Sequence, residues 1–176
     1  MEHKGCLELV ETTDHPFPDV IGCRVDVGRY RLKDPGCSDR EILDSLLADD
    51  RAAYSYIAPR PSPNLDSTDQ VPVHGPYVLS KLDFGSFALS TPEELWARLQ
   101  EFVSEQKTLE STLADLNLDD LLIPTLEVFD SVYRLRADQN KFHPVHAQLE
   151  ILGCFSEYVV IARASRTVLD VITAQD

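Results

Sequence analysis

Histidine and cysteine are the residue types in this chain that could bind a metal ion or provide a nucleophile. His143 and His146 lie three residues apart with Pro144 between them. On a strand these two histidines would point to opposite faces, and on a helix Pro144 would have to lie in the first turn. Four cysteines, none of them in a C-x-x-C pair, are spread along the chain: Cys6, Cys23, Cys37 and Cys154. Because zinc needs three or four ligands that converge on one point, we predict no metal site.

The motifs of common catalytic and nucleotide-binding sites do not occur in the sequence. There is no G-x-S-x-G elbow for a hydrolase serine, and neither of the glycine-rich phosphate-binding motifs is present. Paired carboxylates such as Asp49-Asp50 carry little information, because 30 acidic residues produce such pairs freely. We therefore predict no catalytic residue and no cofactor, and the sequence favours a protein that is not an enzyme.

Net charge is the strongest functional signal. The chain of 176 residues carries 30 Asp and Glu against 16 Lys and Arg, which gives a formal net charge of −14. More than half of the excess lies in residues 91–130. A field of this sign repels nucleic acids and anionic membrane surfaces and attracts cationic partners. We expect no nucleic acid partner and no membrane association, and we suspect a basic protein partner.

The elements that would position these residues begin with two helices. Ser38 and Glu41 form a capping box for a short helix that ends near Asp49. Ser90 to Glu94 is typical of a second helix start, and apolar residues then follow a heptad spacing as far as Leu116. This heptad seam either packs inside the domain or pairs with a second copy, so a monomer and a homodimer both remain open.

Alternating apolar residues predict strands at 6–11, 20–32, 147–152 and 167–172. The alternation changes phase at Gly28, which a β-bulge would explain. Segments 125–136 and 157–164 fit either a helix or a strand. We predict a single α+β domain over residues 1–176, with a Pro-rich loop at 59–76 and a mainly antiparallel sheet with helices on one face. A ferredoxin-like split βαβ core is one candidate arrangement.

The location expected from the sequence is the cytoplasm. No run of about 18 apolar residues is present, and no signal-peptide pattern follows Met1. In that compartment the four cysteines are expected to be reduced.

Three hypotheses for function follow. In the first, an acidic interaction protein binds a basic protein and, in an immunity-like version, inhibits it; small acidic bacterial proteins that neutralise nucleases are similar in size and charge only. Its candidate contact residues are Glu94, Glu101, Glu105, Glu110, Asp115, Asp119 and Asp120. In the second, a small-molecule or enzymatic site lies beneath the 59–76 loop. Its candidate residues are Tyr54, Tyr56, His74, Tyr77, Arg134 and Arg136. In the third, the chain is a dimeric structural or chaperone-like subunit.

Overall fold

The computed structural model describes residues 5–17, 23–53, 71–105, 118–142 and 155–175. Its strands are β1 (Leu7–Pro16), β2 (Cys23–Leu32), β3 (Val73–His74), β4 (Tyr77–Val78), β5 (Phe87–Ser90), β6 (Ser131–Leu135), β7 (Ser156–Ala162) and β8 (Thr167–Gln175). Its α-helices are α1 (Asp39–Leu47), α2 (Pro92–Glu105) and α3 (Leu118–Leu126). Short 3₁₀ turns are η1 (Asp50–Ala53), η2 (Leu79–Lys81), η3 (Phe84–Ser86) and η4 (Gln139–Lys141).

The main sheet has six strands in the order β1-β2-β8-β7-β6-β5, and each neighbouring pair is antiparallel. The predicted α+β class with a mainly antiparallel sheet is therefore confirmed. The ferredoxin-like arrangement is not confirmed. In a split βαβ unit, two parallel strands joined by a helix lie on either side of a third strand, whereas β5 and β6, which are joined through α2 and α3, are direct antiparallel neighbours. β3 and β4 form a separate small hairpin.

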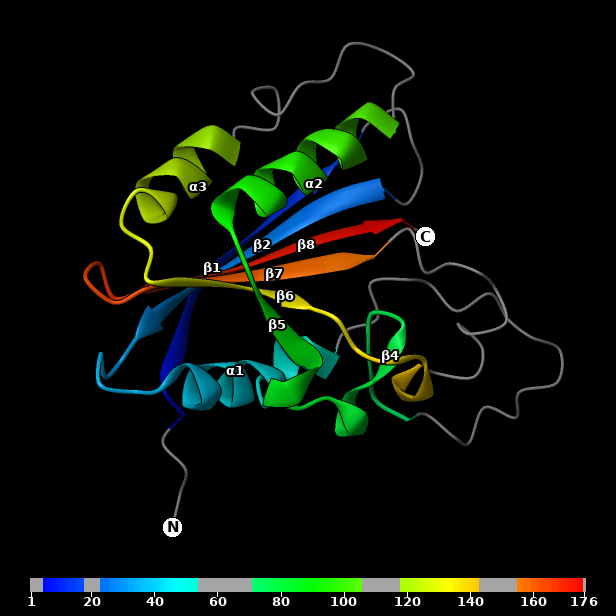
Figure 1. The fold of residues 1–176 in the computed structure, drawn as a ribbon, viewed down its shortest axis with the longest axis horizontal. Helices are drawn as coiled ribbons and strands as arrows, with labels where there is room; N and C mark the ends of the chain where they lie inside the picture. Colours follow the sequence, from blue (N-terminus) through cyan, green and yellow to red (C-terminus); the bar gives the residue numbers. More distant parts are fainter. Residues whose placement is uncertain (1–4, 18–22, 54–70, 106–117, 143–154, 176) are drawn as a thin grey trace, which may run out of the picture.

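Helices cover both faces of the sheet, whereas the sequence predicted helices on one face (Figure 1). In β7, Val159 and Ile161 belong to the core with Leu43 of α1. The alternate residue Val160 belongs to a second core with Leu99 of α2. The continuous apolar run in this strand is therefore the pattern of a strand that is buried on both sides, since successive side chains point to opposite faces.

Gly28 does not form the predicted bulge in β2. The register between β2 and β8 is unbroken, so β2 has no extra residue at Gly28. The change of phase means instead that the buried apolar side chains of β2 move from one face of the sheet to the other. Val27 packs toward α2, and Tyr30 packs toward α1. A Cβ at Gly28 would lie 2.0 Å from Nη1 of Arg51, so the glycine instead leaves room for a guanidinium group.

The predicted helix starts are confirmed. Ser38 and Glu41 form the capping box of α1. In α2, Pro92 occupies the first turn, and Leu95, Leu99 and Phe102 of the heptad seam are buried against the sheet. Residues 106–116 of the seam lie outside the described residues. The described part of the seam therefore packs within the chain.

The two ambiguous segments resolve as follows. Residues 125–136 contain the end of α3 and then β6, and the 157–164 segment is mostly strand β7. The predicted strand at 147–152 and most of the 59–76 loop lie outside the described residues. In the part of the chain that is described, no helix has the length and apolar character needed to cross a membrane.

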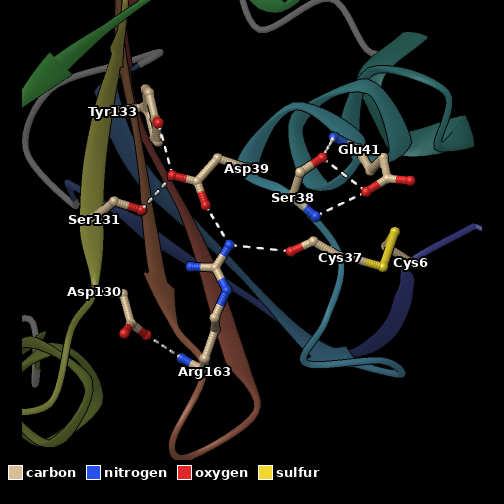
Figure 2. A network of polar contacts seen from close by, with 9 residues as sticks. All are labelled: Cys6, Cys37, Ser38, Asp39, Glu41, Asp130, Ser131, Tyr133 and Arg163. Carbon is tan, nitrogen blue, oxygen red and sulfur yellow. Dashed lines mark hydrogen bonds and ion pairs between the residues drawn. A yellow bond between two sulfur atoms is a disulfide. The ribbon is translucent and has the colours of Figure 1, made fainter.

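One prediction about the cysteines is wrong. Cys6 and Cys37 form a disulfide that joins the segment before β1 to the segment before α1 (Figure 2). Cys23 is buried beneath α2, and Cys154 lies outside the described residues. Because disulfides persist mainly in oxidising compartments, this pairing does not support the predicted cytoplasmic location, from which reduced cysteines were expected.

Candidate functional site

The predicted contact residues that the structure describes lie on α2 and α3, which run side by side on one face of the sheet (Figure 1). Glu94, Glu101, Glu105 and Asp120 are exposed, and Asp119 is half-buried. Glu110 and Asp115 lie outside the described residues.

Two of these carboxylates, those of Glu101 and Glu105, are partly paired with Arg98. Nη1 of Arg98 lies 2.8 Å from Glu101 and 3.7 Å from Glu105. Since exposed ion pairs of this kind contribute little to stability, both glutamates still present negative charge to solvent.

An apolar groove of about 240 Å³ lies between α2 and α3. Its residues are Pro92, Glu93, Trp96, Ile123, Leu126 and Glu127. Ile123 is 42% exposed, and Val128 and Phe129 beyond α3 are similarly exposed. The groove therefore combines an apolar lining with two carboxylates.

The sequence prediction missed this groove because Trp96 and Ile123 lie on separate helices. A sequence signal was nevertheless present. Trp96 is the only tryptophan in the chain and is outside the heptad seam. An aromatic residue off the buried stripe of a helix has to lie partly at the surface.

A second feature is a group of charged residues on the opposite face, where α1 packs. Asp26 of β2 and Asp170 of β8 lie on this face, and Asp26 is directly opposite Asp14 of β1. Glu157 of β7 continues the group toward the interior. Glu157 is 0% exposed and Asp170 is 3% exposed. Fully buried carboxylates are rare and need compensating partners.

His74 is the partner of Glu157. Nε2 of His74 lies 2.5 Å from Oε2 of Glu157, and Nδ1 lies 2.9 Å from the carbonyl oxygen of Ala52. Burial acts to lower the pKa of His74, but the Glu157 carboxylate outweighs it and raises this pKa to about 9. The pair is therefore an imidazolium and a carboxylate at neutral pH, with both ring nitrogens donating hydrogen bonds.

Arg51 is the partner of Asp170. Its Nη1 donates to Oδ2 of Asp170 at 3.0 Å. Burial and the nearby Glu157 nevertheless raise the pKa of Asp170 to about 7. Burial and the facing Asp14 likewise raise the pKa of Asp26 to about 6. The carboxyl groups are thus closer together than the neighbouring cations can fully compensate.

Among the described residues predicted for a small-molecule site, His74 and Tyr77 are direct partners in the β3–β4 hairpin, and the rings of both contact Phe155. His74 lies in the buried charge group, and Tyr77 is buried with its ring stacked on Phe142. Arg134 lies over the ring of Tyr158, which belongs to the core beneath α2. Arg136 is exposed. Tyr54 and Tyr56 lie outside the described residues.

A third polar network anchors α1 to the sheet. Figure 2 shows Asp39, at the start of α1, accepting hydrogen bonds from Ser131, Tyr133 and Arg163. Burial opposes ionisation of Asp39, but these donors outweigh it and lower its pKa. Arg163 also donates to the carbonyl oxygen of Cys37 at 3.1 Å, beside the disulfide. Because its members are satisfied by one another, we interpret this network as structural.

Within the described ranges, no group of three or more His, Cys, Asp or Glu side chains is arranged to hold a metal ion. His143, His146 and Cys154 lie outside those ranges.

Comparison with protein-family models, with curated proteins and with solved structures found no match. Within the described residues, the two features that bear on function are the acidic face of α2 and α3 and the charge group beneath α1.

Proposed function

We propose that this chain is a non-catalytic interaction protein that binds a basic protein partner through α2 and α3. The observation that carries the proposal is the groove between the two helices, in which Trp96, Ile123 and Leu126 are flanked by Glu93 and Glu127. An apolar side chain of the partner would enter the groove, and lysine or arginine residues beside it would meet the carboxylates. Aromatic anchors in pockets with a polar rim are the usual source of affinity in protein interfaces.

Charge supports a basic partner. The excess of acidic residues in 91–130 includes the exposed glutamates of α2. Complementary charge accelerates encounter and disfavours partners of the wrong sign, and salt weakens both effects. Two copies of this chain each carry −14, so long-range repulsion opposes self-association through this face.

The dimer hypothesis receives less support. Leu95, Leu99 and Phe102 would form the described part of an intermolecular seam, but they are buried in the core of the chain itself. A second copy would need another surface.

The test begins with capture of basic proteins at low salt, followed by purification of each captured protein and titration calorimetry. The variant E93K/E127K reverses the two carboxylates of the groove, and W96A removes its aromatic wall. The matched control D44K/D138K changes net charge equally, at exposed positions outside α2 and α3. Circular dichroism checks that each variant is folded.

We expect both groove variants to raise the Kd for the partner by about tenfold or more, as for residues at the centre of an interface. The control should change Kd by only a few fold, through long-range charge. An equal rise in Kd for E93K/E127K and D44K/D138K would mean that net charge alone attracts the partner. That result, or no captured protein at low salt, contradicts the proposal.

A further inference from the structure

A cavity of about 540 Å³ opens on the α1 face of the sheet, between β1, β2 and the segment at 49–51. Its volume falls in the range of sites that bind small molecules. Its charged lining residues are Asp14, Arg24, Asp26, Asp49, Asp50 and Arg51. This cavity is separate from the groove on α2 and α3, since the two lie on opposite faces of the sheet.

Two carboxylates face each other in the cavity wall. Asp14 and Asp26 occupy directly opposite positions on the antiparallel strands β1 and β2. Like charges in such positions destabilise a sheet. Burial and a hydrogen bond between the two carboxyl groups raise the pKa of Asp26 to about 6. Above about pH 6 Asp26 is therefore ionised beside a second carboxyl group, and a cation could bridge the two.

The two arginines of the lining are already engaged with carboxylates. Nε of Arg24 lies 3.6 Å from Asp26, and Nη1 of Arg51 lies 3.0 Å from Asp170. An anionic ligand would have to compete for both of them, in a lining that holds four aspartates.

Asp170 gives an independent indication of missing positive charge or hydrogen-bond donors. It is 3% exposed, and it lies opposite Gly28, over which the Arg51 guanidinium is placed. Its Oδ1 has no hydrogen-bond partner among the described residues. A buried carboxylate oxygen without a donor is costly and calls for an explanation. The Arg51 side chain connects this carboxylate to the cavity wall.

We propose that this cavity binds a small organic cation through a guanidinium or primary amine group, with Asp14 and Asp26 as the acceptors. A planar guanidinium can donate to two carboxylates at once, and such charge-assisted bonds are about twice as strong as neutral ones. No covalent chemistry is involved. Near pH 6, where Asp26 is about half protonated, binding releases the proton of Asp26 to solvent and the cation takes its place.

Binding should depend on pH. The groups that face Asp26 are Asp14 on β1, Arg24 on β2, Asp170 on β8 and Arg51 in η1. Below about pH 6 the proton competes with the ligand, so affinity should rise as pH increases through this value.

Butylguanidine is the probe, and butylurea is its neutral isostere. Chemical-shift titration of the ¹⁵N-labelled protein locates binding, and calorimetry near pH 6 in two buffers of different ionisation enthalpy measures proton release. We expect saturable shifts at β1, β2 and η1 with butylguanidine and none with butylurea. D14N and D26N should each weaken binding by about tenfold or more, and D26N should abolish the proton release. D44N, an exposed aspartate on α1, is the control.

D14N keeps the test decisive if D26N fails to fold, because Asp14 is exposed. Butylguanidine shifts that are unchanged in D14N, or equal for the two probes, would overturn the proposal. So would weak shifts spread over the acidic surface. Because the groove on the opposite face is unaltered in D14N, failure here is distinguishable from failure of partner binding.

Discussion

Replacing Glu157 with glutamine should remove a specific pH dependence of stability. Glu157 and His74 are buried together, and the carboxylate raises the pKa of the imidazole from 6.5 to about 9 against the effect of burial. In E157Q the amide can still hydrogen-bond to Nε2 of a neutral His74, while Nδ1 continues to donate to Ala52. The substitution is therefore isosteric and removes the cause of the raised pKa.

The sign and size of this pH dependence of stability follow from proton linkage. A histidine whose pKa is raised in the folded state contributes stability that is fully present below its unfolded pKa and is lost as pH increases through the folded one. One pH unit corresponds to about 1.4 kcal/mol. Between about pH 7.5 and the folded value of about 9, the wild type should therefore lose about 2 kcal/mol of unfolding free energy. Starting at about pH 7.5 leaves most of the Asp170 titration, at about 7, below the window.

Urea unfolding monitored by tryptophan fluorescence, at intervals from about pH 7.5 to about pH 10, measures this loss. Cysteines and the α-amino group also titrate in this range, but they are common to both proteins and cancel in the difference. We expect E157Q to lose about 2 kcal/mol less than the wild type across the window. If the unfolding free energies of the two proteins changed in parallel with pH, the assignment of an ionised pair in the core would be refuted.

Two further predictions concern stability. Reduction of the Cys6–Cys37 disulfide, which spans 31 residues, should lower the unfolding free energy by about 4 kcal/mol, because the unfolded chain regains the entropy of an open loop. Urea unfolding with and without reductant measures this loss. Alkylation of both thiols in unreduced native protein would show that the bond is absent. G28A should displace the Arg51 guanidinium, because the new Cβ would lie 2.0 Å from Nη1, and leave Asp170 without this partner. We expect a loss of roughly 1–3 kcal/mol in the same assay, and an unchanged midpoint would contradict the placement of Arg51.

The local features of this fold were predictable from sequence. The capping box at Ser38 and the proline start of α2 depend on contacts between residues a few positions apart, so the residue types suffice to predict them. The class of the fold follows from alternation along the strands. The phase change at Gly28 was seen but misinterpreted, because alternation cannot say which face of a sheet a helix will cover.

The charged cavity was not predictable in the same way. Asp14 and Asp26 are directly opposite only because β1 and β2 pair in one particular register, and Asp170 reaches the same region from the far end of the chain. His74 was a candidate, yet its partner Glu157 lies in a strand whose other residues are mostly apolar. A charged residue in a buried strand is a signal in itself, since it requires a compensating partner from elsewhere in the fold.

The division of the protein into two faces makes its proposed activities separable. The sheet places the acidic groove of α2 and α3 on one side and the carboxylates of the cavity on the other. Charges on opposite sides of a domain influence each other mainly through the long-range field, which physiological salt screens over about 8 Å. E93K/E127K should therefore leave butylguanidine binding nearly unchanged at physiological salt, and D14N should leave partner binding nearly unchanged. If each variant impaired both activities, the common cause would be net charge, and neither surface would act as a specific site.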